Sequence, residues 1–168
     1  MLFGWSSLLS TGLLVASIAV LIAAALHDII ARTVPNWMAA TLALLGVAAV
    51  SLNGRPLVSV SSALFVFLLG ILCWARGWLG GGDVKLLSAA MLVVPPGRAA
   101  SFICAVALTG AVLALLYIAA RRVIPAPGSR RPTRLLARAI RAERWRIRRS
   151  GPLPYALAIA AGFLITTL

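Results

Sequence analysis

Residues 80–86 read Gly80-Gly81-Gly82-Asp83-Val84-Lys85-Leu86. This stretch places a carboxylate at the start of an apolar segment, directly after three residues without side chains. The chain has 168 residues but only three acidic ones, Asp28, Asp83 and Glu143. Both aspartates border long apolar runs, whereas Glu143 lies among arginines. Ionisable groups at membrane depth are energetically unfavourable and are usually functional. The two aspartates are therefore the first candidates for chemistry.

The composition around this stretch is that of a membrane protein. Hydrophobic residues make up 62% of the chain and charged residues only 11%. A water-soluble domain of this size needs far more polar surface than that. The first 26 residues carry no charged side chain, so the basic start of a cleavable signal peptide is missing. We therefore expect a polytopic membrane protein whose first helix is retained.

Six mainly apolar segments are candidates for membrane helices, because a spanning helix needs about 20 mostly apolar residues and fewer where the membrane is thin. They cover approximately residues 8–26, 37–52, 57–74, 84–94, 99–120 and 153–168. The fourth segment is short, and we expect it to extend into the glycine run or to stop before the far surface. The sequence predicts an all-α protein of about six transmembrane helices, with residues 1–168 forming a single membrane-embedded domain.

The basic residues predict how these helices are oriented. With six crossings, one side of the membrane collects fourteen basic residues, namely Arg32, Arg76, Lys85 and eleven arginines between residues 121 and 149. The other side collects only two, Arg55 and Arg98. Because loops rich in Lys and Arg remain in the cytoplasm, we expect both termini outside. Asp28 and Asp83, although 55 residues apart, then lie at one membrane depth on the cytoplasmic side and can meet.

The segment 121–150, before the last helix, is the one long polar stretch of the chain. The net charge of the chain, +13, could suggest a nucleic-acid partner, but eleven of its arginines gather in this segment. That distribution is typical of a topogenic signal, so we expect no nucleic-acid binding. We predict a helix on the inner leaflet, with arginines at the anionic headgroups of the lipid bilayer and Trp145 dipping inward. A docking surface for an acidic partner is the alternative.

Each aspartate also has an ordinary structural explanation. Asp83 directly precedes the fourth segment, where aspartate is a preferred helix N-cap. Asp28 lies at the C-terminal end of the first helix, where the helix dipole disfavours a carboxylate. Arg32, four residues further on, could pair with Asp28. Such pairs stabilise helices by only about 0.2–0.5 kcal/mol, so this pair compensates weakly for the unfavourable position.

Two carboxylates in close approach are suited to general acid–base catalysis. Neighbouring carboxylates do not easily both ionise, so one keeps a proton while the other stays charged. The charged group takes a proton from water, and the protonated group donates to a carbonyl oxygen. The pair therefore predicts amide hydrolysis without a metal or another cofactor, with a pH dependence that belongs to the pair. The glycines before Asp83 let backbone and substrate approach it closely, although a flexible linker is the alternative.

Other chemistries are less consistent with the sequence. The glycine run lacks the G-x-x-x-x-G-K-[ST] pattern of a nucleotide-binding loop. His27, Asp28 and Asp83 are the candidates for a metal site, but they are too few, and we expect His27 simply to lie at the membrane interface. No G-x-S-x-G motif accompanies the histidine. Cys73 and Cys104 occur singly inside apolar runs, which indicates buried thiols and not a disulfide framework.

Three motifs, in order along the chain, resemble the prepilin peptidase family of membrane-embedded aspartic proteases. Residues 80–86 are similar to its G-x-G-D signature. Asp28, followed by Val34-Pro35-Asn36, is similar to the first catalytic aspartate and the proline motif downstream of it. Pro154-Tyr155-Ala156, with Gly162 beyond, resembles the last segment of the family. One motif alone is weak, but three on the same predicted side of a six-helix chain are a specific signal.

The resemblance implies a multi-pass protein of the cell's inner (cytoplasmic) membrane that cleaves prepilin-like precursors at the cytoplasmic face. It implies removal of a short basic leader after a glycine and ahead of an apolar helix. Asp28 and Asp83 correspond to the catalytic pair. The residues that correspond to supporting motif positions are Pro35, Asn36, Gly80, Gly82 and Lys85.

The chain departs from the longer members of that family in two ways. It has no four-cysteine zinc module, so it resembles the short form that serves tight-adherence (Flp-type) pili, and the resemblance gives no support for methyltransferase activity. The arginine-rich segment before the last helix is not part of the family pattern. The sequence carries no signal for an oligomeric state.

Two other functions compete with the peptidase. A small proton-coupled carrier or channel could use the aspartates as relay sites. It requires carboxylates near the middle of the membrane and a polar path, whereas the sequence places them at an interface. A non-catalytic membrane anchor acting through the arginine segment is the third possibility.

Overall fold

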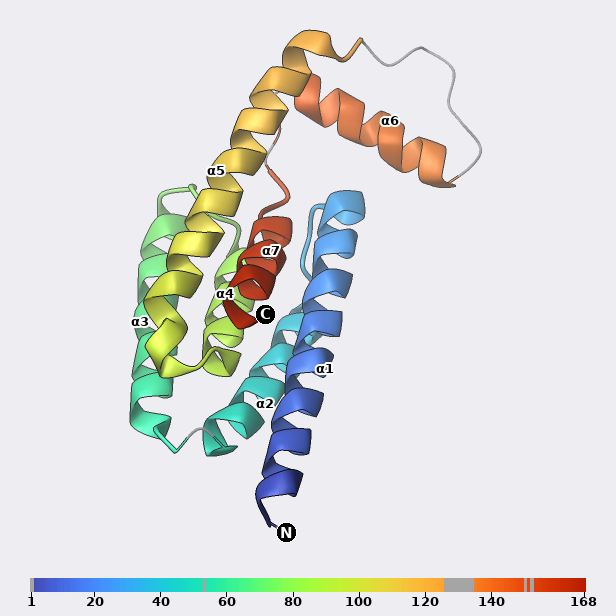
Figure 1. Ribbon diagram of the computed structural model, residues 1–168. Helices are drawn as coiled ribbons and strands as arrows, with labels where there is room; N and C mark the ends of the chain where they lie inside the picture. Colours follow the sequence, from blue (N-terminus) through green and yellow to red (C-terminus); the bar gives the residue numbers. More distant parts are fainter. Residues whose placement is uncertain (1, 53, 126–134, 150, 152) are drawn as a thin grey trace.

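The computed structural model of the chain describes all residues except 1, 53, 126–134, 150 and 152. The described residues form α-helices and one short 3-10 turn, without a strand (Figure 1). The helices are α1 (Leu2–Ala31), α2 (Asn36–Leu52), α3 (Pro56–Ala75), α4 (Gly81–Val93), α5 (Ala99–Val123), α6 (Leu135–Arg148) and α7 (Tyr155–Thr167). The turn η1 (Pro96–Arg98) precedes α5. The predicted all-α membrane class is confirmed.

Each of the six apolar segments forms a helix near its predicted limits, and the polar segment contributes α6. Residues 126–134, which belong to the polar segment and precede α6, lie outside the described residues. The helix α1 is longer than predicted, because it continues until Arg32 adopts a left-handed backbone with φ 56°. Pro35 follows and prevents helix continuation. The helix α4 begins at Gly81, inside the glycine run, as the shortness of the fourth segment suggested.

Among the described residues, three helical stretches are by themselves long and apolar enough to cross a membrane, Ser7–Ala31, Pro56–Ala75 and Pro96–Val123. The helices α4 and α7 have 13 residues each. At 1.5 Å per residue such a helix is about 20 Å long, which is shorter than the roughly 30 Å hydrocarbon core. Six crossings and external termini therefore stay a prediction.

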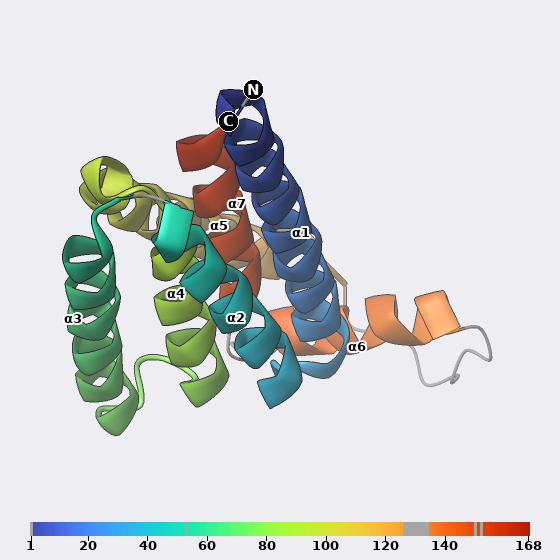
Figure 2. The ribbon, with the colours of Figure 1, turned by 90° about the horizontal axis from the view of Figure 1, so that it is seen from below.

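The two short helices occupy the middle of the bundle (Figures 1 and 2). The helix α4 packs against α2 and α3, α7 packs against α1 and α5, and α4 and α7 also contact each other. Phe102 of α5 and Phe163 of α7 meet edge to face, with ring centroids 6.1 Å apart. The largest fully buried side chains come from α1, α2, α4, α5 and α7 and include Leu21, Leu42, Leu86, Met91, Phe102, Ile159 and Phe163.

Glycines allow the short helices to pack closely against their neighbours. A Cβ added at Gly162 of α7 would lie 2.7 Å from the backbone nitrogen of Val106 in α5. A Cβ added at Gly46 of α2 would lie 2.5 Å from the Cβ of Leu92 in α4. Small residues at helix contacts are the usual means of packing in membranes, where lipid is as apolar as the side chains. This packing holds α4 and α7 in fixed positions between the longer helices.

One end of the bundle gathers the segments that carry the candidate residues. The C-terminal ends of α1, α3 and α5, the first turns of α4 and α7, and α6 all lie at this end (Figure 1). The alternating direction of successive helices agrees with the alternation used to predict the topology. Both aspartates therefore lie at the α6 end of the bundle.

Candidate active site

Asp83 lies in the first turn of α4 as its third residue, not directly before the helix. Gly80 occupies the N-cap position, with φ −72° and ψ 141°. The backbone N–H of Gly80 donates a hydrogen bond to the Asp83 carboxylate, in the manner of the return bond of a capping box. Asp83 is therefore not the N-cap residue of α4, and that explanation of it is wrong. The helix dipole nevertheless favours a carboxylate in this turn.

The glycine run is closely packed, so the linker explanation is also wrong. A Cβ at Gly80 would lie 2.7 Å from Oδ2 of Asp83, which is too close for any other residue without movement of the carboxylate. A Cβ at Gly82 would lie 3.0 Å from the Cβ of Val34, in the loop between α1 and α2. Gly80 therefore allows the backbone to lie close to the Asp83 carboxylate, and Gly82 allows α4 to lie close to the loop between α1 and α2.

The second motif lies in that loop, and a hydrogen bond joins it to α4. Nζ of Lys85 donates to Oδ1 of Asn36 at 3.0 Å, across a sequence separation of 49 residues. The backbone N–H of Met38 donates to the carbonyl of Pro35 at 3.1 Å and opens α2. Together with the contact between Gly82 and Val34, these bonds bring the supporting motif residues to one place.

Asp28 lies in the last turn of α1 and is only 6% exposed. Its Oδ2 accepts a hydrogen bond from the backbone N–H of Ala156 at 3.4 Å. Ala156 is in the first turn of α7, where N–H groups have no helical partner and the dipole is positive. The start of α7 thus offsets the unfavourable position of a carboxylate at the end of α1. Arg32, the ordinary partner suggested by the sequence, forms an ion pair with Glu143 of α6.

The carboxylates of Asp28 and Asp83 lie within electrostatic reach of each other. Oδ1 of Asp83 is buried and has no hydrogen-bond partner among the residues that the structure describes. Nearly all buried polar atoms are hydrogen-bonded, so such an atom requires an explanation. A proton shared with a second carboxylate or a bound reactant provides one, and both fit an acid–base site.

The remaining candidates have simpler surroundings. Nδ1 of His27 lies 2.7 Å from the carbonyl oxygen of Thr33, in the loop that follows α1. In the described part of the chain, no three His, Cys, Asp or Glu side chains form a cluster that could hold a metal ion. Cys73 and Cys104 are free thiols, but Cys73 is half-buried and Cys104 is exposed on the apolar helix α5, so the prediction that both thiols are buried is wrong.

An apolar hollow of about 660 Å³ lies between α3, α4 and α5. Leu69 of α3, Met91 of α4 and Ile103 of α5 line it, and Tyr155 of α7 also contributes to its wall. Tyr155 lies within electrostatic reach of Asp83. Tyr155 therefore lies both in the wall of the hollow and near Asp83.

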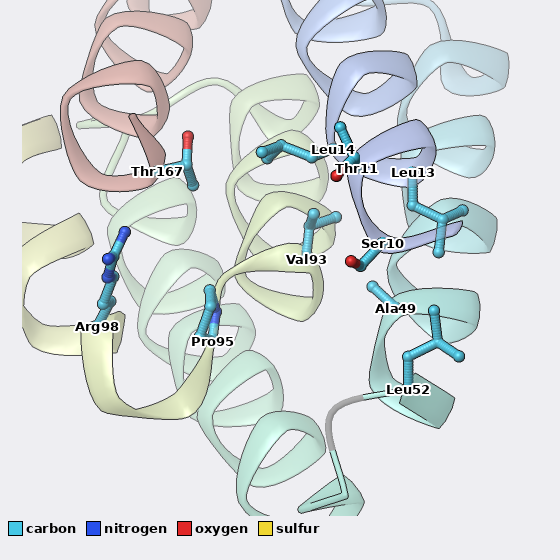
Figure 3. Close-up of a pocket in the computed structure, with 10 residues that line it drawn as sticks. All are labelled: Ser10, Thr11, Leu13, Leu14, Ala49, Leu52, Val93, Pro95, Arg98 and Thr167. Atoms are coloured by element: carbon cyan, nitrogen blue, oxygen red, sulfur yellow. The ribbon is translucent and has the colours of Figure 1, made fainter. Parts of the chain in front are cut away.

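A smaller hollow of about 200 Å³ lies at the opposite end of the bundle (Figure 3). Its lining comes from α1, α2, α4, η1 and α7, and includes Ser10, Leu52 and Arg98 but no acidic side chain. It offers no carboxylate for acid–base chemistry, so the α6 end remains the candidate site.

Comparison with known protein families agrees with this geometry. The model of the type IV leader peptidase family matches residues 4–115, which include both aspartates and both motif segments that contact each other. The chain belongs to the type IV leader peptidase family. No curated protein and no solved structure matches it.

Family membership confirms the resemblance read from the sequence and makes the chain a membrane protease of the leader-peptidase type. A prepilin-like substrate is the class that this family suggests. The matched range ends before α6 and α7, although α7 supplies the N–H that meets Asp28. Sequence reasoning missed this role of Ala156 because every residue except proline carries a backbone N–H.

Proposed function

We propose that the protein is an aspartic endopeptidase that removes the short basic leader from prepilin-like precursors at the cytoplasmic face of the inner membrane, with Asp28 and Asp83 as its catalytic pair. The observation that carries the proposal is that α1 and α4 deliver a buried carboxylate, Asp28, and a half-buried one, Asp83, within electrostatic reach of each other. These are the only aspartates in a chain that belongs to a leader peptidase family.

The reaction proceeds by general acid–base catalysis. The ionised carboxylate accepts a proton from water while the water oxygen bonds to the scissile carbonyl carbon. The protonated carboxyl donates its proton to the carbonyl oxygen, and the pair exchanges roles as the C–N bond breaks and the amine leaves protonated. Gly80 and Gly82 keep the approach to Asp83 narrow and free of side chains. Lys85 and Asn36 hold the two motif segments together.

The substrate approaches from the bilayer in this proposal. Its apolar helix, which follows the cleaved bond, lies in the hollow between α3, α4 and α5, so that the bond to be cut reaches Tyr155 and Asp83. Its basic leader lies on the cytoplasmic side. The enzyme is the short, Flp-type form, and the proposed activity is cleavage alone.

The arginine-rich segment faces the cytoplasm and rests on anionic lipid headgroups. Trp145 is 50% exposed, and the guanidinium of Arg149 lies 4.4 Å from the centroid of its ring. An exposed aromatic ring beside arginines is typical of a helix at a membrane interface.

The test is to replace each aspartate by its neutral isostere and to follow cleavage of a prepilin-like precursor in liposomes. We expect Asp28→Asn and Asp83→Asn each to lower kcat by at least about 100-fold, because each removes one partner of the acid–base pair. The melting temperature in detergent shows whether the variants are folded. Normal processing by either variant would falsify the proposal. A proton-flux assay on the same liposomes separates the peptidase from a proton-coupled carrier, which loses flux in these variants.

A further inference from the structure

The helix α6, which lies outside the matched family range, is joined to two other helices through one carboxylate. Glu143 accepts hydrogen bonds from Arg32, which follows α1, from Tyr117 of α5 and from Arg146 of α6 itself. The side chains of Arg32 and Glu143 are only 10% and 19% exposed. Because partly buried charges are stable only when paired, these contacts fix α6 at one position on the bundle.

Arg146 extends this network to the end of α1. Its guanidinium donates to the carbonyl oxygen of Ile29 at 3.0 Å and to that of Ile30 at 3.2 Å. These carbonyls directly follow Asp28, in the turn where helical carbonyls have no partner of their own. A cation is favoured at this end of a helix. Arg146 therefore caps the turn of α1 that carries Asp28, from a sequence distance of 117 residues.

The contact of Glu143 with Arg32 stabilises an unfavourable backbone conformation at Arg32. Arg32 has φ 56°, a left-handed conformation that is unfavourable for a residue with a Cβ. Its backbone N–H donates to the carbonyl of Asp28 at 2.8 Å and closes the helix end. Its guanidinium is bound by Glu143 and by the Tyr117 hydroxyl, the latter at 3.2 Å. Such conformations persist where the surrounding contacts determine them.

We infer that Glu143 and Arg146 are positioning residues for Asp28. By holding Arg32 and by capping Ile29 and Ile30, they fix the last turn of α1 and so set the place of the Asp28 carboxylate relative to Asp83. This inference rests on the proposed function, because it describes how one member of the catalytic pair is aligned. It distinguishes Arg146, which holds the end of α1, from the exposed Arg138 and Arg144 of the same helix.

The experiment uses two neighbouring arginines. Arg146→Gln and Arg144→Gln remove the same charge from the same helix, but Arg144 is exposed whereas Arg146 caps α1. Cleavage of a precursor is measured in liposomes of phosphatidylcholine with a constant fraction of phosphatidylglycerol, so that kcat, KM and the pH profile are obtained for each variant.

We expect Arg146→Gln to lower kcat by about tenfold or more, since small misplacements of catalytic groups have effects of this size. KM should change little, because the substrate contacts are intact. The pH profile should also move, because the spacing of the two carboxylates changes their interaction. Glu143→Gln should act in the same direction and serves as the second variant if Arg146→Gln does not fold. Arg144→Gln should match the unmodified protein in all three respects.

Equal losses in the Arg144 and Arg146 variants would overturn the inference, because the charge would then act through the lipid surface. A change in KM alone would overturn it as well. Asp28→Asn is measured in the same assay: if it cleaves normally, the peptidase proposal itself fails. If it is inactive while Arg146→Gln and Glu143→Gln retain the kcat of Arg144→Gln, only the positioning role fails.

Discussion

Asp28 and Asp83 differ in what holds them in place. Asp83 lies in the first turn of its helix, and its carboxylate is held by the N–H of Gly80, three residues earlier. Asp28 lies in the last turn of its helix and depends on Ala156 of α7, 128 residues later. The end of its helix depends on Arg146, 117 residues after Ile29. One carboxylate is held by local contacts, and the other by tertiary contacts.

This difference follows from the direction of the two helices. A carboxylate in a first turn is stabilised by its own helix dipole and by nearby N–H groups. A carboxylate in a last turn meets unpaired carbonyls and a negative dipole, so its stabilisation must come from other elements. The start of α7 and the guanidinium of Arg146 supply that stabilisation. We therefore expect local substitutions to disturb Asp83 and distant ones to disturb Asp28.

Among the substitutions that test this comparison, the largest effect is expected for Gly80→Ala, which tests the local side. The added Cβ lies 2.7 Å from Oδ2 of Asp83, so the carboxylate must turn away from its present position. We expect kcat for precursor cleavage to fall by about 100-fold in a protein that still folds. Gly97→Ala is the control, because a Cβ there meets nothing within 4 Å. An unchanged kcat in Gly80→Ala would show that Asp83 does not depend on the glycine run.

A smaller effect is expected for Gly162→Ala, which tests the distant side. Its Cβ would lie 2.6 Å from Cγ2 and 2.7 Å from the backbone nitrogen of Val106, so α7 must move away from α5 and carry Ala156 with it. Overpacking of this kind destabilises a fold by about 1–3 kcal/mol. We expect a lower melting temperature in detergent and roughly a tenfold lower kcat, because Asp28 loses its partner.

Gly12→Ala in α1 is the matched control for that substitution. A Cβ at this position meets nothing within 4 Å, and alanine favours a helix over glycine by about 1 kcal/mol. Its melting temperature should therefore be unchanged or higher. If Gly162→Ala behaves in the same way, the contact between α5 and α7 is not what places Ala156.

The smallest effect is expected for the bond between the two motif segments. Lys85→Met and Asn36→Ala each remove the exposed 3.0 Å hydrogen bond that joins α4 to the start of α2. A hydrogen bond of this kind contributes about 1 kcal/mol, so kcat/KM should fall about fivefold at most. Because both substitutions remove the same bond, the double variant should be no worse than either single one. Additive losses would mean that the two side chains act separately.

The sequence was sufficient to predict the fold class, the approximate helix positions and the glycine motif. Long apolar runs have few structural solutions in a membrane, so their length and composition alone indicate where the helices lie. The start of α4 was less predictable, because glycines have low helix propensity and resemble a loop. In the structure, Gly81 lies against Trp74 and Gly82 lies against Val34 in the first turn of α4. Neither contact can be predicted from the local sequence.

The surroundings of Asp28 could not be predicted from the same information. Arg146 is one of eleven arginines between residues 121 and 149, and only the face that α6 presents to α1 distinguishes it from Arg144. Glu143 was set apart from the site because arginines surround it in sequence, yet it binds Arg32 beside the end of α1. The spacing of Asp28 and Arg32 suggested an ion pair, but it carries no information on the left-handed backbone of Arg32.

The dependence of Asp28 on α7 has a consequence for biosynthesis. A ribosome adds residues in chain order, so Asp28 is synthesised 128 residues before Ala156. During that interval Asp28 has neither its amide donor nor the arginine that caps its helix. The nascent chain can form both of these contacts only after α6 and α7 have been translated. The order of synthesis therefore delays assembly of the site until the last helix has packed into the bundle.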